Sequence, residues 1–252
     1  MEIISKFFLL LFMLTLLPSN VSALPFNVGE RLEFNLTWSG IKAGTTVMEI
    51  SGISDVGGRE ALHMVSRSNP SKIVSALYDV NNWTDFYVDA KTLAPLKYEV
   101  VQQKKGRKKN KSAIFDLERN EVEFTKGGNK KVVKVSDGII DPFSLIYYLR
   151  TLDLKPEVEI ELDTFANGKI YITVVKVVGR EKIRVGGGSF ETIKVHTRSR
   201  DKGSEELRGK EGTYIWFTDD QYKIPVKIMA KIKVGYITAE LDKVEGGGGS
   251  KR

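Results

Sequence analysis

The sequence contains no cysteine. This absence excludes disulfide bonds, thiol catalysis and cysteine-ligated metals, together with the lipid attachment site of a bacterial lipoprotein. Histidine is scarce as well, since His63 and His196 are the only two. The sequence also has no Gly-x-Ser-x-Gly elbow, His-Glu-x-x-His pair, phosphate-binding loop or dinucleotide fingerprint. We therefore expect a protein that is not an enzyme and that carries no metal or cofactor.

The few residues that could support catalysis have simpler structural interpretations. Both histidines lie in strand-like segments, where each is expected to occupy a strand face; a metal site or an acid–base pair is the alternative. Asp219 and Asp220 could bind Ca²⁺ or share a proton. They lie between two strand-like segments, however, where an aspartate commonly accepts a hydrogen bond from the backbone two residues later. A turn is therefore the favoured interpretation of this acidic pair.

No apolar run reaches the roughly 20 residues that a membrane-spanning helix needs. The longest one, residues 7–17, follows Lys6 and precedes Pro18, and the small residues 21–23 (VSA) resemble a signal cleavage site. Residues 1–23 are therefore predicted to be a cleaved export signal, with an uncleaved N-terminal anchor as the alternative. The mature protein is expected in the periplasm or at the outer membrane, without a lipid anchor.

The chain is basic, with a formal net charge of +7. An exported basic protein favours anionic partners such as lipid or lipopolysaccharide head groups, or an envelope protein, and nucleic acid is not expected in that compartment. Residues 104–111 concentrate this charge in a predicted hairpin tip. The cations of this basic hairpin are Lys104, Lys105, Arg107, Lys108, Lys109 and Lys111. They indicate either a solvated loop that protects a sheet edge or a contact with an anionic surface.

Apolar and polar residues alternate through nearly all of the chain after Phe26, which predicts antiparallel strands with one apolar face. Residues 32–38, 96–100, 158–162 and 226–234 are the clearest cases. Residues 170–178 are apolar on both faces, which predicts a central strand or one covered on its second side. Glycine-rich turn signals at 57–58, 127–129, 167–168 and 186–188 separate the strands. The fold class is mainly β, a curved antiparallel sheet of half-barrel or sandwich type.

One helix interrupts the strands. Asp141 is a suitable N-cap, Pro142 fits the first helical turn, and the pattern predicts a helix that extends to Leu152. Because almost its whole circumference is apolar or aromatic, the helix must be packed on most sides, most simply against the concave face of the sheet. We expect one domain over residues 24–245, followed by a flexible Gly/Ser tail at 246–252.

Two short segments resemble each other. Residues 41–44 (IKAG) are similar to 232–235 (IKVG), and each is followed by an acidic and an aliphatic residue. Chance is the favoured explanation, and two similarly placed strands that lie near each other are the alternative.

Three blocks together resemble a known family. They are residues 26–34 (FNVGERLEF) with 38–44 (WSGIKAG), residues 141–150 (DPFSLIYYLR), and residues 215–220 (IWFTDD) with 224–226 (IPV) and 235–241 (GYITAEL). In this order they resemble the domain of unknown function (DUF) 3108 family of exported bacterial proteins. The resemblance implies a mostly β protein of the Gram-negative envelope with no established activity. The basic hairpin is not part of the family pattern.

Three functions remain open on these grounds. The leading hypothesis is a non-enzymatic binder of an apolar or lipid-like ligand, in a groove lined by Phe143, Tyr147 and Tyr148; a fully packed core is the alternative to that groove. Proteins that carry lipids or lipoproteins in the envelope often have a curved sheet closed by a helix, an analogy of fold alone. The second hypothesis is a structural or scaffolding protein that docks through the basic hairpin. The third is an enzyme that acts on envelope glycans through Asp219, Asp220 or a histidine.

Overall fold

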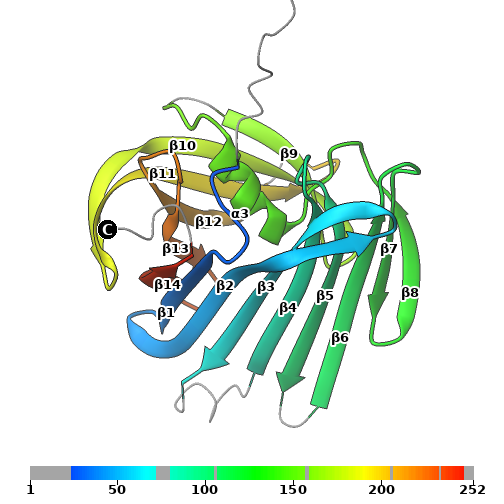
Figure 1. Ribbon diagram of the computed structural model, residues 1–252, viewed down its shortest axis with the longest axis horizontal. Coiled ribbons are helices and arrows are strands. Elements are labelled where there is room, and N and C mark those ends of the chain that lie inside the picture. The colour runs from blue at the N-terminus through cyan, green and yellow to red at the C-terminus, as the bar shows by residue number, and fades with distance from the viewer. Residues whose placement is uncertain are drawn as a thin grey trace, which may run out of the picture.

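The computed structural model describes residues 24–71, 80–104, 107–156, 159–204, 207–232 and 234–246. Within this part of the chain, fourteen strands form one sheet in the order β8-β7-β6-β5-β4-β3-β2-β1-β14-β13-β12-β11-β10-β9 (Figure 1). The first eight are β1 (Arg31–Trp38), β2 (Ile41–Val56), β3 (Arg59–Pro70), β4 (Val80–Asp89), β5 (Pro95–Lys104), β6 (Arg107–Asp116), β7 (Glu121–Lys126) and β8 (Asn129–Lys134). The others are β9 (Glu159–Ala166), β10 (Lys169–Val185), β11 (Gly188–Asp201), β12 (Leu207–Thr218), β13 (Pro225–Lys231) and β14 (Tyr236–Glu245).

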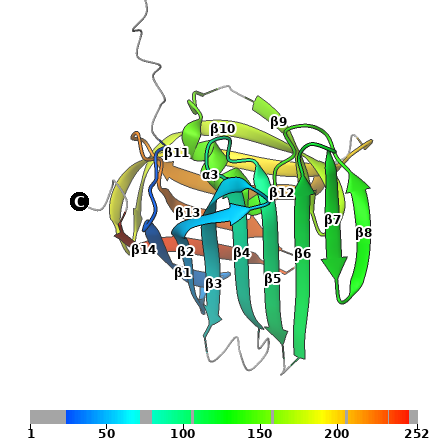
Figure 2. The same cartoon turned by 45° about the vertical axis from the view of Figure 1, so that its right-hand side comes forward.

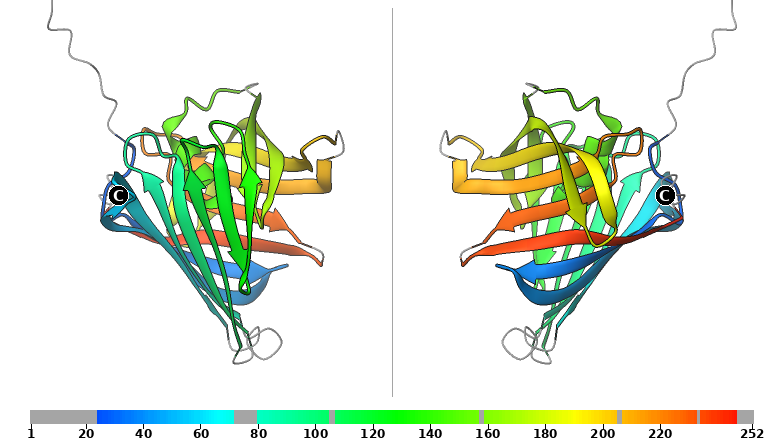
Figure 3. Two further views of the ribbon diagram at one scale, coloured as in Figure 1. Left: turned by 90° about the vertical axis from the view of Figure 1, so that its right-hand side faces the viewer. Right: turned by 90° about the vertical axis from the view of Figure 1, so that its left-hand side faces the viewer.

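The chain follows two antiparallel meanders, β1–β8 and β9–β14, which join where β1 pairs with β14. The two edge strands, β8 and β9, are consecutive in sequence. The sheet curves around the helix α3 (Pro142–Thr151), which lies inside the curve (Figures 1 and 2). Figure 3 shows that the strands of the two meanders cross in direction on opposite sides of the molecule. The predicted curved antiparallel sheet with one helix on its concave face is therefore confirmed.

Side chains and one short backbone pairing bridge the gap between β8 and β9. Ile140, just before α3, pairs in parallel with β9: its N–H donates to the Asp163 carbonyl at 3.0 Å, and its carbonyl accepts from the Phe165 N–H at 2.8 Å. From β8, the Lys131 ammonium donates to the Gly168 carbonyl at 2.6 Å. These contacts hold the two edges near each other without completing the ladder.

The helix begins and ends where the sequence predicts. The Asp141 side chain accepts hydrogen bonds from the N–H groups of Phe143 and Ser144, at 2.8 and 3.2 Å, and Leu152 is the C-cap. Tyr147 lies on one side of the helix, in the larger core cluster, which covers β1–β7 and extends to β9, β10 and β12–β14. Leu145 and Leu149 belong to a second cluster against β10–β12. The helix is apolar all round because it separates two cores. No helix in the described residues has the length and apolar character needed to cross a bilayer.

Two details of the strand predictions need correction. Residues 170–178 were expected to form a central or covered strand; β10 is paired with β9 and β11 and Val174 on its second face is buried, but Val178 is half exposed, so that face is covered only in part. The alternation over 226–234 was expected to continue to Val234, but β13 ends at Lys231. Ile232 and Val234 lie in the turn that follows and are 40% and 68% exposed. In both places the apolar pattern extends beyond the surface that the core covers.

The register divides the turns between two ends of the sheet. The end that carries turns 39–40, 127–128, 167–168 and 232–235 is called the hairpin rim below. The opposite end carries turns 57–58, 186–187 and 219–224 and the C-terminal end of α3, and is called the helix rim. All five of the glycine or aspartate turns predicted from the sequence occur where expected.

Candidate functional site

A cavity of about 400 Å³ lies between the N-terminal half of α3 and the inner face of β9–β13. One side of the cavity is apolar and is formed by Leu145 and Ile146 of the helix with Ile215 and Ile228 of the sheet. The other side carries hydroxyl groups. They belong to Thr164, Thr173, Thr197, Ser199 and Thr213. No charged side chain lines the cavity.

The hydroxyl side faces the hairpin rim, because Ala166 and Asn167 of the β9–β10 turn also line the cavity. The period of two along each strand explains this gradient. On β10 the inward residues change from Val177 and Val175 to Thr173 toward this rim, and β11 and β12 change in the same direction. The interior of the β9–β14 half is therefore apolar beside the helix and polar at its hairpin-rim end.

The hydroxyl groups form a network with one another. Thr173 Oγ1 lies 2.8 Å from Thr164 Oγ1 and 3.0 Å from Ser199 Oγ, and Thr197 Oγ1 donates to the Thr213 carbonyl at 3.4 Å. A hydroxyl has one donor and two acceptor positions, so such a network keeps unused capacity to bond an uncharged polar group. Sequence reasoning missed these residues, although the change from valine to threonine at every second position was a signal that could have found them.

A buried ion pair fixes the other end of the helix. Arg150 Nη1 and Nη2 lie 2.5 and 2.8 Å from the two carboxylate oxygens of Glu30, and both side chains have less than 2% of their surface exposed. Arg150 Nε also donates to the Tyr222 carbonyl at 3.0 Å, and the guanidinium lies over the Phe26 ring. The pair thus ties α3 to the start of β1 and to the β12–β13 turn. The Glu30 carboxylate gives the guanidinium hydrogen-bond acceptors and an opposite charge, without which its burial in an apolar core would be costly.

The predicted groove residues lie in the core rather than along this cavity. Tyr147 is buried with its ring edge-on to Phe26, 5.2 Å between centroids, and Phe143 stacks on Phe86. Tyr148 is half-buried beside the second cluster. Burial and the Glu30 carboxylate raise the pKa of the Tyr147 hydroxyl, which has no hydrogen-bond partner among the described residues. That any of the three contacts a ligand stays a prediction.

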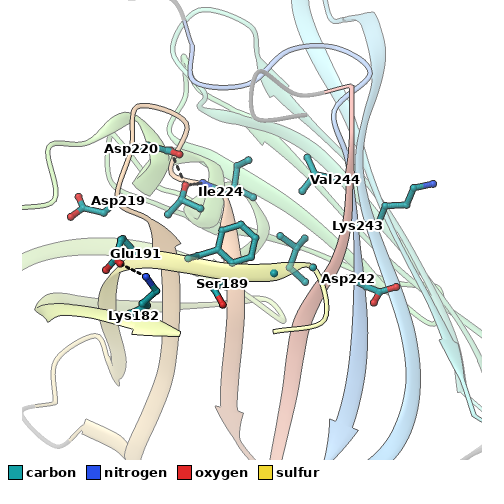
Figure 4. A pocket seen from close by; sticks show the side chains of 14 residues that line it. Lys182, Ser189, Glu191, Asp219, Asp220, Ile224, Asp242, Lys243 and Val244 are labelled. Carbon is teal, nitrogen blue, oxygen red and sulfur yellow. Dashed lines mark hydrogen bonds and ion pairs between the residues drawn. The ribbon is translucent and has the colours of Figure 1, made fainter. Parts of the chain in front are cut away.

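A second cavity, of about 610 Å³, lies at the helix rim between the β10–β11 tip, β14 and the β12–β13 turn (Figure 4). Its charged side chains form ion pairs or hydrogen bonds with residues close to them. Asp219 is 2.6 Å from Arg180 Nε, and Lys182 is 3.0 Å from Glu191. Asp220 accepts a hydrogen bond from the Tyr222 N–H at 2.9 Å, two residues later. The interpretation of this acidic pair as a turn is therefore confirmed.

The histidines lie on strand faces, as expected. His63 points away from the core that buries its neighbours Leu62 and Met64, and it stacks on Tyr87 at 4.5 Å. Its Nδ1 is 2.9 Å from Ser51 Oγ and its Nε2 is 3.0 Å from Asp85. This chain of hydrogen bonds crosses β2, β3 and β4 on the open outer face, and neither cavity described above includes it.

His196 has a similar position in the other half of the sheet, where it stacks on Tyr214 at 4.2 Å. In the described residues, no group of three or more histidine, aspartate or glutamate side chains is placed to hold a metal ion.

The basic hairpin forms between β5 and β6, as predicted. Lys105 lies outside the described residues, and so do the side chains of Lys104 and Arg107. Lys108 and Lys109 are exposed. Lys111 donates to Asn167 Oδ1 at 2.9 Å, and burial, Lys126 and Lys109 lower the pKa of its ammonium. The cations are thus brought to the hairpin rim, near the β9–β10 turn that borders the 400 Å³ cavity.

A curved sheet closed around a single helix places the molecule among β-barrel-like proteins. Its fold is similar to a β-barrel-like protein of the domain of unknown function DUF1849 from Brucella abortus, with a TM-score of 0.54 and 12% identity over 86% of this chain and 97% of that chain. The chain belongs to the DUF3108 family of proteins of unknown function, whose model matches residues 33–242. The family suggested by the three sequence blocks is therefore confirmed.

More distant structural likenesses exist. A candidate lipoprotein from Parabacteroides distasonis has a TM-score of 0.34 and 10% identity, over 87% of this chain and 96% of that chain. A candidate exported protein with a YmcC-like fold from Bacteroides fragilis has a TM-score of 0.32 and 12% identity, over the same shares. No curated protein matches the sequence. At these identities the likenesses describe the fold and carry no function over to this chain.

Proposed function

We propose that this protein is an exported, non-enzymatic protein of the cell envelope that binds an amphipathic, lipid-like molecule in the cavity beneath α3. The observation that carries the proposal is the division of that cavity into an apolar side at the helix and a hydroxyl side at the hairpin rim. An acyl chain matches the apolar side, and an ester, amide or hydroxyl group matches the hydroxyl side.

The size and charge of the cavity support this class of ligand. Its volume of about 400 Å³ lies within the range of about 300–1,000 Å³ that is usual for small-molecule sites. Because no charged side chain lines it, a charged head group would be left without a partner inside, and such burial is costly. The ligand therefore places at most a neutral polar group in the cavity, and any charge remains outside at the rim.

Export is supported by residues 1–23 of the sequence, which lie outside the described residues. Their basic start, apolar run and small-residue cleavage site are typical of a secretory signal. Mass spectrometry of the protein recovered from producing cells tests whether the signal is cleaved, and we expect an N-terminus at Leu24. An intact Met1 would contradict cleavage.

Lipid binding is tested on the protein purified from the envelope, by solvent extraction with mass spectrometry and by uptake of a dansylated fatty acid. Ser199→Leu together with Thr213→Leu fills the hydroxyl side of the cavity and should abolish uptake of the probe. Ser54→Leu, near the helix-rim end of β2, changes a hydroxyl in the same way outside the cavity and is the matched control. Absence of any extracted lipid together with failure of the wild type to take up the probe would contradict the proposal.

Docking on an anionic membrane through the basic hairpin is the second candidate function. Lys108 and Lys109 favour it, because they are exposed and have no ion-pair partner among the described residues. Each cation near an anionic surface contributes up to about 1 kcal/mol. Lys108→Glu with Lys109→Glu should abolish co-sedimentation with anionic vesicles, and the wild-type interaction should weaken with added salt. Unchanged sedimentation of the variant would exclude this role.

A further inference from the structure

Two hairpin tips lie side by side at the hairpin rim. They are residues 38–42, between β1 and β2, and residues 231, 232 and 234–236, between β13 and β14; together we call them the paired tips. Trp38 Nε1 donates to the Val234 carbonyl at 2.8 Å, and the Ser39 N–H donates to the Tyr236 carbonyl, also at 2.8 Å. The turn that leads into residues 41–44 and the turn that contains Val234 are thus neighbours in space.

The paired tips expose apolar side chains together. Ile41 is 57% exposed, Ile232 40% and Val234 68%. Single exposed apolar residues are common on soluble proteins, but a group of them at one projecting point indicates an interaction surface. These three belong to two turns that are joined by hydrogen bonds, so they form one apolar point rather than scattered residues.

Lysines accompany this apolar point. Lys42 and Lys231 are exposed, and the sequence has no aspartate or glutamate over residues 34–48 or 221–239. Turns at the helix rim differ, since 57–58 is flanked by Asp55 and Glu60 and the turn after β12 contains Asp219 and Asp220. The two tips therefore carry lysines and no acid of their own, whereas the helix-rim turns carry acids.

The aromatic residues of the tips are less exposed than the aliphatic ones. Trp38 and Tyr236 are half-buried, and the Lys231 ammonium lies 4.3 Å from the centroid of the Tyr236 ring. Exposed aliphatic, half-buried aromatic and cationic side chains are the residue types that the successive layers of a bilayer surface accommodate. Aliphatic groups are stable among the acyl chains, tryptophan and tyrosine among the head groups, and lysines beside the phosphates.

We propose that the paired tips insert into the surface of an anionic phospholipid bilayer and hold the hairpin rim against it. The insertion is independent of the proposed ligand binding. The two are compatible in geometry, because the hydroxyl side of the 400 Å³ cavity faces the same rim. The contact differs from docking through the basic hairpin, since apolar side chains that reach the acyl region resist salt more than lysines do.

The test is flotation of the purified protein, with its N-terminus read by mass spectrometry, on vesicles of phosphatidylcholine with and without phosphatidylglycerol. The wild type should float with the vesicles that contain phosphatidylglycerol. Ile41→Asp with Val234→Asp should lower the partition coefficient about tenfold or more, because two charges would enter the acyl region. Ile53→Asp is the matched control, since Ile53 is 52% exposed on β2 toward the helix rim, and it should float like the wild type.

Several outcomes would overturn the proposal. They are a wild type that does not float, a double variant that floats as well as the wild type, or an Ile53→Asp variant that is equally impaired. Loss of flotation in Lys108→Glu with Lys109→Glu but not in the double tip variant would assign the contact to the basic hairpin instead. Thermal melts confirm that the variants are folded, and uptake of the dansylated fatty acid without vesicles reports ligand binding separately from docking.

Discussion

At the scale of single residues, the ion pair between Arg150 and Glu30 joins two charged side chains inside the core. Both side chains are fully buried, and the guanidinium is also bonded to the Tyr222 carbonyl and stacked on Phe26. Removal of one partner would leave the other charged and unpaired in an apolar surrounding, which is costly. Replacement of both by apolar residues removes that penalty.

We therefore predict that Arg150→Met lowers the free energy of unfolding by about 3–5 kcal/mol. The double variant Arg150→Met with Glu30→Leu should recover much of that loss. Urea denaturation of the wild type, both single variants and the double variant measures the coupling. Equal losses for the single and the double variants would show that the ion pair itself, rather than an unpaired charge, determines the effect.

Asp89 gives a prediction for the dependence of stability on pH. Burial acts to raise the pKa of its carboxyl, but hydrogen bonds from Thr92 and Lys91 and the charge of Arg59 outweigh burial, so the pKa lies below the ordinary value. The unfolded chain then binds a proton more readily than the folded one. The stabilisation is present above the unfolded pKa of about 3.9 and is lost as pH falls toward the folded pKa.

We expect Asp89→Asn to be less stable than the wild type at pH 7 and the difference to shrink at pH 3 and below. Urea denaturation across this range measures it. Asp55→Asn is a control, because Asp55 also accepts a hydrogen bond from a turn N–H, that of Gly58 at 3.1 Å, but is exposed to water. A difference for Asp89→Asn that stays constant with pH would show that Asp89 acts through shape rather than charge.

Sequence reasoning could place Arg150 on the helix but could not identify its partner. Helical periodicity fixes which residues share a face, whereas Glu30 is 120 positions away and belongs to the segment before β1. The groove residues show the same limit. The apolar character of Phe143 and Tyr147 predicted that they are buried. It did not predict whether they pack in a filled core or line a cavity. The cavity depends on small hydroxyl residues that leave space.

At the scale of elements, α3 was the best predicted feature, because Asp141 and Pro142 determine where a helix can begin. The Asp141 carboxyl is fully buried, and burial raises its pKa although Ser144 and two backbone N–H groups donate to it. Its capping role thus depends on hydrogen bonds rather than on full charge.

We predict that Asp141→Ala lowers the free energy of unfolding by about 0.5–2 kcal/mol, the usual cost of a lost N-cap. Asp141→Asn should retain most of the stability, because its amide oxygen can still accept from the Phe143 N–H. Chemical denaturation measures both variants. An Asn variant as unstable as the Ala variant would show that the negative charge is required.

The paired tips illustrate an element-scale feature that alternation misjudged. The pattern continued through Ile232 and Val234, but strand pairing ends at Lys231, because Gly235 closes a turn against Ser39. Gly235 has a φ of +78°, and a Cβ there would collide with the Ser39 hydroxyl. Only glycine permits this approach without strain.

Gly235→Ala is therefore expected to cost about 1–3 kcal/mol. Gly58→Ala is the matched control, since Gly58 has a φ of +81° but a Cβ added to it would meet no atom within 4 Å. Comparison of the two by urea denaturation separates the cost of the backbone conformation from that of the collision. Equal losses would mean that the contact with Ser39 contributes nothing.

At the scale of the whole molecule, the sheet is continuous because its first and last strands pair. Alternation predicts individual strands, but it carries no information on the pairing of β1 with β14, which are separated by nearly the whole chain. The similarity of residues 41–44 to 232–235 was the one trace of this neighbourhood in the sequence. The hydrogen bond from Trp38 to the Val234 carbonyl shows that the two turns lie near each other, as the alternative to chance expected.

The open edge of the sheet has a consequence that can be tested. β8 has only one neighbouring strand, and its sequence NKKVVK presents Lys130 and Lys134, which pair with Glu123 and Glu121. Exposed Val132 would otherwise offer an edge to a second molecule. Lysines on an edge strand oppose such pairing, because an added strand would bring like charges together and displace their water.

We predict that Lys130→Thr with Lys134→Thr promotes self-association through β8, seen as concentration-dependent growth in light scattering and gel filtration. Lys97→Thr with Lys176→Thr removes the same charge from β5 and β10, at positions where each strand is paired on both sides. This control should remain monodisperse at the same concentration. If both double variants associate equally, loss of net charge rather than exposure of the β8 edge causes the association. If neither does, the contacts of Lys131 and Ile140 with the β9 side of the gap are sufficient to protect the edge.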